Sequence, residues 1–172
     1  HHKQFFRGNL KVYEDSVDVL AESRGERLKE VAELEDSTVL NWMEYTYWLS
    51  GRITELTETD PAASEKLKDE MELWLRKTHE IGNIDATESL ATFLYEDRDQ
   101  AESALPLWRE AATTGHEVAL NNLFNVVSGS NDIPEEEKNL SLKALWEGVA
   151  VGTKAGRELA VRLREAGYVE PA

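Results

Sequence analysis

The stretch ALPLWREAATTGHEVALNNL, residues 104–123, determines the predicted fold. It places Trp108 in its first half, Gly115 near its middle, and Ala119 and Leu123 one turn apart in its second half. Glycine adopts the left-handed conformation that ends a helix more easily than other residues, so Gly115 predicts a turn between two helices. A small residue where helices cross and a large one a turn later let one helix pair stack on the next. We therefore expect Trp108, Ala119 and Leu123 to be buried.

The same classes of residue recur around two further glycines. Gly82, Gly115 and Gly152 lie 33 and 37 residues apart, which is within the range of two-helix repeats. A tryptophan precedes each glycine, and a small residue and two packing residues follow it at matched offsets. The aligned sets are Trp74, Ala86, Leu90 and Phe93; Trp108, Ala119, Leu123 and Val126; and Trp146, Gly156, Ala160 and Leu163. This recurrence predicts an internal helical repeat.

With these residues the sequence resembles the tetratricopeptide-like superfamily and, within it, the Sel-one-like repeats. Residues 104–123 carry the best copy, and the copies around Trp74 and Trp146 are degenerate. Thr78 and His79 stand where an alanine pair is usual, and Gly156 replaces the usual alanine. The resemblance covers about residues 64–167 and implies stacked helix pairs that bind proteins and catalyse no reaction. The alternative is an irregular helical bundle in which Trp and Gly recur through ordinary packing.

Helix signals continue along the rest of the chain, and strand signals are absent. Helices are expected to start near Asp36-Ser37 and at Asp60-Pro61, because these residues can cap or open a helix. Five more are expected over residues 84–96, 99–114, 117–128, 134–151 and 153–166. Since no run alternates apolar and polar residues with β-branched enrichment, we predict an all-α fold. The expected architecture is a short right-handed α-solenoid of antiparallel helix pairs, with about eight helices.

The N-terminal third has apolar stripes but no match to the repeats. One stripe runs through Leu10, Tyr13, Val17, Leu20, Leu28 and Val31, and Gly25 is expected to interrupt it. A second stripe is expected through Val39, Leu40, Met43 and Tyr47, broadened by Trp42 and Trp48. The expected segments are a tag remnant with an extension (1–8), a helical segment packing on the repeats (9–60), the repeats (61–167) and a tail (168–172).

Charge and composition restrict the possible partners. Asp and Glu number 34 against 19 Lys and Arg, which gives 172 residues a net charge of −15 and repels nucleic acid and anionic membranes. Cysteine is absent, which removes thiolate chemistry and every Cys-based metal site. No apolar run reaches the ~20 residues of a membrane span, and no leader precedes the helical pattern. We therefore expect a cytoplasmic location and no association with nucleic acid or membrane.

No catalytic or metal-binding motif stands out in the sequence. His79-Glu80 and His116-Glu117 begin like a zinc-protease helix, but the required second histidine is missing after each. A turn or surface role is the better interpretation of both histidines. Many of the carboxylates fall by chance at helical pair spacing, so spacing selects no acid-base pair. We expect no cofactor, no metal and no enzymatic activity.

A second stripe on the helices that follow the glycines is the candidate partner surface. In stacked repeats it would line one curved face, which corresponds to the ligand groove of the tetratricopeptide-like superfamily. Two amides a turn apart, Asn121 and Asn125, could donate to and accept from an extended peptide. The stripe could equally be plain helix surface. Its residues are Glu88, Thr92, Tyr95, Asn121, Asn125, Ser128, Glu158, Arg162 and Glu165.

Two classes of function agree with these features. The first is a non-enzymatic adaptor or regulator that holds a peptide or protein in the repeat groove. The second is an immunity or antitoxin protein whose acidic surface neutralises a cationic toxin, because a charge of −15 would steer such a partner. A helical enzyme with an unrecognised carboxylate site is a third, weaker alternative.

Overall fold

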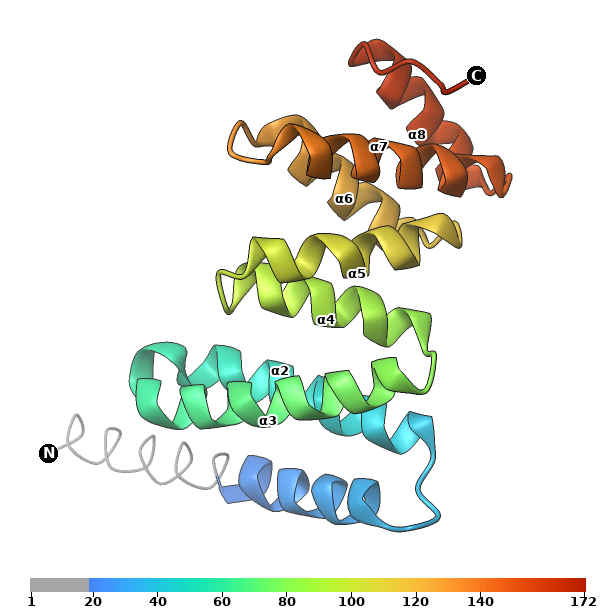
Figure 1. Ribbon diagram of the computed structural model, residues 1–172. Coiled ribbons are helices and arrows are strands. Elements are labelled where there is room, and N and C mark those ends of the chain that lie inside the picture. The colour runs from blue at the N-terminus through green and yellow to red at the C-terminus, as the bar shows by residue number, and fades with distance from the viewer. Residues whose placement is uncertain (1–18) are drawn as a thin grey trace, which may run out of the picture. The chain divides into compact units, whose positions relative to one another are not determined.

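The computed structural model describes residues 19–172, and over these residues the chain is helical without a strand (Figure 1). The predictions for residues 1–8 and for Leu10, Tyr13 and Val17 lie outside the described residues. Eight helices occupy the described part, which confirms the all-α prediction. They are residues 19–33, α2 (Val39–Thr59), α3 (Pro61–Glu80), α4 (Ile84–Glu96), α5 (Ala101–Thr113), α6 (Glu117–Gly129), α7 (Glu135–Ala150) and α8 (Lys154–Glu165).

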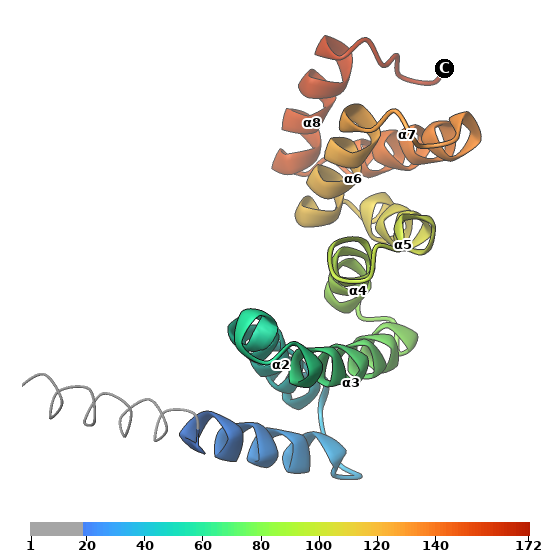
Figure 2. The same ribbon diagram turned by 90° about the vertical axis from the view of Figure 1, so that its left-hand side faces the viewer.

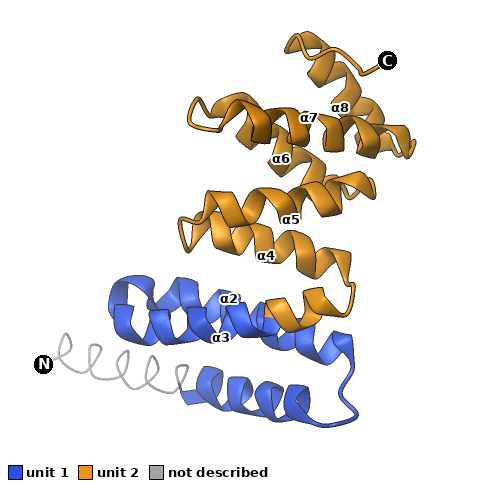
Figure 3. Cartoon of the chain, in the orientation of Figure 1, with its two compact units in different colours: residues 1–74 blue, residues 75–172 orange. Residues whose placement is uncertain are grey.

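The chain divides into two compact units, His1–Trp74 and Leu75–Ala172 (Figure 3). The division falls inside α3, beyond the boundary expected at residue 60. The physical reason is that the first part of α3 belongs to the core of unit 1: Leu67, Met71 and Trp74 pack with Tyr45 and Leu49 of α2. The helix therefore starts in one core and ends in the other unit.

Unit 1 has a core of aromatic side chains. The Tyr45 ring lies edge-on to the Trp74 ring, with 5.7 Å between centroids, and stacks on Trp48 at 6.1 Å. Trp48 in turn lies directly over Gly25, where an added Cβ would come within 2.3 Å of the indole ring. The expectation that Gly25 interrupts the first helix is wrong, because the helix continues through it to residue 33. This glycine makes room for a tryptophan.

Helix α2 buries a different face from the one the apolar stripe predicted. Leu40 is 72% exposed and Tyr47 is 84% exposed. The buried apolar positions are Tyr45, Leu49 and Ile53, which share one side of the helix. The stripe prediction was wrong at Leu40 and Tyr47 because aromatic and aliphatic residues occur on more than one face of α2, and only packing partners select among the faces.

Unit 2 begins each of three helices with the same kind of turn. Gly82, Gly115 and Gly152 have φ of +89°, +84° and +90°, as expected for glycines that terminate helices. The residue after each glycine caps the next helix, because its side chain accepts a hydrogen bond from the backbone N–H three residues on. These caps are Asn83, His116 and Thr153. The predicted bounds of α4 to α8 are confirmed to within two residues.

Helix α5 is the centre of unit 2, since it contacts α4, α6 and α7, while α8 packs on α6 and α7 (Figure 2). Trp108 is 2% exposed, and Ala119 and Leu123 are completely buried, which confirms the prediction for all three residues. Leu90, Leu145 and Leu163 complete the fully buried centre. This packing fixes the orientation of α4, α5 and α6, the helices on which the candidate site is built.

Candidate partner-binding site

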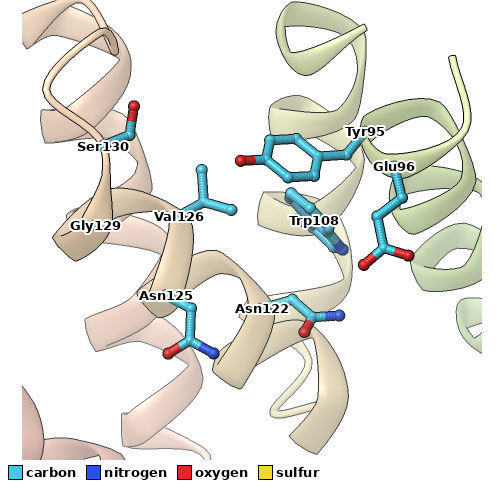
Figure 4. A pocket seen from close by; sticks show the side chains of 8 residues that line it. All are labelled: Tyr95, Glu96, Trp108, Asn122, Asn125, Val126, Gly129 and Ser130. Atoms are coloured by element: carbon cyan, nitrogen blue, oxygen red, sulfur yellow. The ribbon is translucent and has the colours of Figure 1, made fainter. Parts of the chain in front are cut away.

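A pocket of about 340 Å³ opens between α4, α5 and α6 (Figure 4). Figure 4 shows Tyr95 and Trp108 on one side of the pocket and Asn125 and Val126 on the other. This volume is about that of one large amino-acid side chain. The lining residues are Tyr95 and Glu96 from α4, Trp108 from α5, Asn122, Asn125, Val126 and Gly129 from α6, and Ser130 after it.

Two aromatic rings form the apolar wall of the pocket. The centroids of Tyr95 and Trp108 lie 5.2 Å apart at an interplanar angle of 52°. Tyr95 is 37% exposed, whereas Trp108 is almost completely buried. The indole Nε1–H of Trp108 is buried and has no hydrogen-bond partner within the described part of the chain. A buried donor without an acceptor costs about 1–3 kcal/mol.

A buried carboxylate holds one amide of the pocket in place. Glu88 of α4 is 9% exposed, and its Oε1 accepts hydrogen bonds from Thr92 Oγ1 at 2.6 Å and from Asn122 Nδ2 at 3.0 Å. Asn122 Nδ2 also lies 3.4 Å from Thr92 Oγ1. Because both contacts engage the amide nitrogen of Asn122, its Oδ1 remains an available acceptor. These contacts join α4 to α6.

An arginine from α8 holds the second amide. Arg162 Nη2 donates to Asn125 Oδ1 and its Nη1 donates to Asn121 Oδ1, both at 3.2 Å. The guanidinium lies 4.5 Å from the centroid of the Phe124 ring, a cation–π distance. Since Asn125 uses its oxygen for Arg162, its NH₂ group is not part of this contact. Two amides that are held by hydrogen bonds therefore line the pocket.

The structure brings five of the nine predicted residues into two clusters, places a sixth at the pocket and leaves the other three apart. Glu88 and Thr92 meet Asn122, and Asn121, Asn125 and Arg162 meet one another; Tyr95 stands at the pocket itself. Ser128 donates to the carbonyl of Phe124 at 2.7 Å. Glu158 lies 3.9 Å from Lys154, and Glu165 is exposed.

One of these residues is placed differently from the prediction. Glu88 was expected on an open face, but it is buried and its carboxylate is engaged inside the unit. The reason is that α6 covers this part of α4, so the hydroxyl of Thr92 and the amide of Asn122 surround the carboxylate. Glu88 therefore positions a pocket residue and lies too deep to reach a partner.

Sequence reasoning missed Asn122, Glu96 and Val126 as pocket residues. Asn122 directly follows the predicted residue Asn121, which is a second amide at the same place in the sequence. Neighbouring residues on a helix point about 100° apart, so the stripe that contained Asn121 did not include Asn122. Trp108 was predicted only as a core residue, and no pattern in the sequence indicates that its N–H is left without a partner. Both facts depend on which face of α6 meets α4 and α5.

The two histidines that resembled a metal motif have other contacts. His116 caps α6, and its Nε2 lies 2.7 Å from Asp85 Oδ1. His79 Nδ1 lies 2.6 Å from Thr87 Oγ1. No group of three or more His, Asp or Glu residues is placed to hold a metal ion within residues 19–172.

No protein-family model, curated protein or solved structure matches this chain. The resemblance to Sel-one-like repeats therefore rests on the residues quoted above alone. Across the described helices, none combines the length and the apolar character needed to cross a membrane.

Proposed function

We propose that this chain is a non-enzymatic interaction module, an adaptor or regulator, whose pocket receives a side chain of a peptide or protein partner. The observation that carries the proposal is the ring of Tyr95, which is exposed at the pocket and lies 5.2 Å from the buried ring of Trp108. The Tyr95 ring packs against the core on one side and is accessible on the other. It therefore gives a partner an apolar contact of fixed geometry.

The surroundings of the pocket favour a polypeptide ligand. Asn121, Asn125 and Arg162 form a polar surface next to the pocket and continue onto α8. Groups that are already held by hydrogen bonds lose little freedom when a partner binds, which favours affinity. The pocket itself has room for about one side chain, so the remaining contact must come from the surface around it.

The proposal includes the helix-pair repeat and its solenoid arrangement. Its support is local: Gly82, Gly115 and Gly152 share a positive φ, and each is followed by a side-chain cap. In a stack of such pairs the helix after each glycine would contribute to one surface. The pocket residues Asn122, Asn125 and Val126 come from one of these helices, α6.

Binding by pocket variants tests this function. A partner is first captured from the source cells and purified, and its affinity is measured for the chain and for Tyr95→Ala. We expect Tyr95→Ala to weaken binding by about 1–3 kcal/mol, because an interface tyrosine is removed. Tyr47→Ala is the matched control, since Tyr47 is 84% exposed and lies in the other unit. Equal affinity of both variants and the unchanged chain would refute the proposal.

A second candidate function, neutralisation of a cationic protein, is favoured by a specific acidic surface. A cavity of about 560 Å³ between α5 and the start of α7 is lined by Glu102, Asp132, Glu136 and Glu137. Glu137 is paired with Arg109 at 2.6 Å, while the other three carboxylates are exposed. This candidate predicts association that slows steeply with added salt and is insensitive to Tyr95→Ala.

A further inference from the structure

We infer that the partner binds through a basic polypeptide segment, which places a lysine or arginine in a cavity beside the pocket that Tyr95 lines. This inference rests on the proposed function and specifies the chemistry of its partner. The pocket between α4, α5 and α6 is called the Tyr95 pocket below. The second cavity, between α5 and the start of α7, is called the acidic cavity. One segment of the partner would occupy both.

The two cavities adjoin each other at the turn between α6 and α7. Ser130 lines the Tyr95 pocket, and Asp132, two residues on, lines the acidic cavity. The backbone N–H of Asp132 donates to Ser130 Oγ at 3.2 Å, so the walls of the two cavities are in direct contact. Two residues of chain span at most about 7 Å. A partner segment of a few residues is therefore long enough to reach from one cavity into the other.

The acidic cavity has an apolar lining that suits a long basic side chain. Its volume is about 560 Å³, larger than the 340 Å³ of the Tyr95 pocket. Leu105, Ile133 and Pro134 line it, and Leu105 is 3% exposed. Lysine and arginine lay their methylene groups along apolar surface and keep the charged end near water. This cavity therefore offers contact to the whole side chain and not only to its charge.

Three carboxylates of the acidic cavity carry negative charge that the chain leaves unbalanced. Glu102, Asp132 and Glu136 are exposed, and none forms an ion pair within residues 19–172. Glu137 differs from them, because it pairs with Arg109 at 2.6 Å. The positive ends of α5 and α7 lie nearby but amount to only about half a charge each. The remaining negative potential attracts a cation over a Debye length of about 8 Å, without requiring the three groups to bind one atom.

Other partner chemistries fit the two cavities less well. An acidic segment would meet Glu96 in the Tyr95 pocket and the three carboxylates in the acidic cavity. Two basic side chains of unit 2 have contacts elsewhere and line neither cavity. The Arg98 guanidinium lies 5.5 Å from the Phe93 ring centroid, and the Lys138 ammonium lies 5.5 Å from that of Tyr168. A neutral segment would gain nothing from the negative potential.

Selection of peptides on the full chain tests the inference. A random-sequence peptide display library is panned on the protein in about 0.15 M salt, and clones that fail to bind Tyr95→Ala are kept. We expect these clones to carry a lysine or arginine within about five positions of a shared apolar or aromatic residue, the reach of a short extended segment. Replacing this basic residue with glutamine in a synthetic peptide should lower the affinity about fivefold.

Two double variants show whether the basic residue lies in the acidic cavity. Glu102→Gln with Glu136→Gln removes two charges from the cavity. Glu110→Gln with Glu147→Gln removes two charges from exposed residues farther along the same helices, and neither residue lines the cavity. At roughly 1.5 Å per residue, these control positions lie about 12 Å or more along the helix from the cavity residues, beyond the Debye length of about 8 Å.

The affinities of the basic and the glutamine peptide are compared on each variant. We expect the fivefold preference for the basic peptide to fall below about twofold on the cavity variant and to persist on the control variant. Because both peptides are measured on the same protein, a change in the stability of a variant cancels. On the unchanged chain, salt of about 0.5 M should reduce the preference below about twofold as well.

The possible outcomes separate this inference from the proposed function. Tyr95-dependent peptides without a basic residue at this distance would overturn the inference and leave the Tyr95 pocket as an interaction site. A preference for the basic peptide that persists on the cavity variant or in high salt would do the same. If every selected peptide bound Tyr95→Ala as well as the unchanged chain, or if no peptide bound, the inference and the proposed function would both be wrong.

Discussion

Gly148 of α7 lies against the backbone of Ala112 in α5. A Cβ placed on Gly148 would come within 2.2 Å of the Ala112 carbonyl oxygen and 2.6 Å of Leu120 Cδ2. The two helices therefore cross at a distance that no side chain larger than hydrogen allows. This crossing holds α7 on the central helix of unit 2 and helps to set the position of α5, which carries Trp108.

We predict that Gly148→Ala destabilises the protein by about 1–3 kcal/mol. The methyl group must displace a backbone carbonyl and a fully buried leucine, and overpacking of a close helix contact has a cost of this size. The control is Gly51→Ala, since Gly51 is helical and has nothing within 4 Å of its added Cβ. That variant should gain about 0.5–1 kcal/mol from helix propensity. Urea denaturation of both variants measures the two effects.

Leu123 is completely buried where α6 packs within unit 2. We predict that Leu123→Ala lowers the free energy of unfolding by about 2–5 kcal/mol through lost burial and a residual cavity. Leu40→Ala is the control, because Leu40 is 72% exposed and should lose less than about 0.5 kcal/mol. Similar losses in the two variants would contradict the packing of α6.

Unit 1 contains a polar network at the edge of its aromatic core. Glu70 accepts a hydrogen bond from Tyr45 at 2.7 Å and lies 3.0 Å from Lys29 Nζ. Burial raises the pKa of Glu70, but the hydrogen bonds from Tyr45 and Lys29 outweigh burial and hold it below its usual 4.5. The hydrogen bond to Glu70 raises the pKa of Lys29, and burial together with the same carboxylate raises the pKa of Tyr45.

These shifts predict a pH dependence with a defined sign. The pKa of Glu70 is lowered in the folded chain. Its contribution to the free energy of unfolding is therefore present above its unfolded pKa and is lost as the pH falls through its folded pKa. Lys29 and Tyr45 also contribute to the free energy of unfolding at neutral pH. These contributions are lost as the pH rises through their raised pKa values. Neutral pH therefore lies in the range where all three groups stabilise unit 1.

Glu70→Gln tests the acid side of this dependence. At about pH 7 we expect the variant to be less stable by about 1–2 kcal/mol, a value reduced for the partial exposure of Glu70. The difference should shrink as the pH falls to about 3, since the unchanged chain then loses the carboxylate charge. Glu30→Gln makes the same charge change at an exposed residue and should show no such pH-dependent loss of stability. A stability difference between Glu70→Gln and the unchanged chain that stays constant with pH would contradict the network.

Arg162 and Asn125 should be coupled in stability. Their hydrogen bond is exposed, so we expect a double-mutant cycle of Arg162→Ala and Asn125→Ala to give a coupling energy of about 0.5–1 kcal/mol. Asn122 lies on the same helix but bonds to Glu88. A cycle of Arg162→Ala with Asn122→Ala should therefore give less than about 0.3 kcal/mol. Equal coupling energies in the two cycles would show that the interaction of Arg162 is not specific to Asn125.

The sequence by itself determined the helices and much of the core of unit 2. Gly115 and Gly152, the caps after them and the helical spacing of apolar residues are local features, and each acts within a few residues of the chain. For this reason the bounds of α4 to α8 and the burial of Trp108 and Leu123 could be predicted without a structure.

Only the tertiary structure decided what the faces of those helices do. Gly25 lies inside a helix because Trp48 of another helix covers it. Asn121 and Asn122 are neighbours in sequence, yet one meets Arg162 of α8 and the other meets Glu88 of α4. Each successive helical residue turns by about 100°, so the partner of a side chain depends on the rotation of the whole helix against its neighbours. That rotation is fixed by packing between segments far apart in the chain, which no local pattern contains.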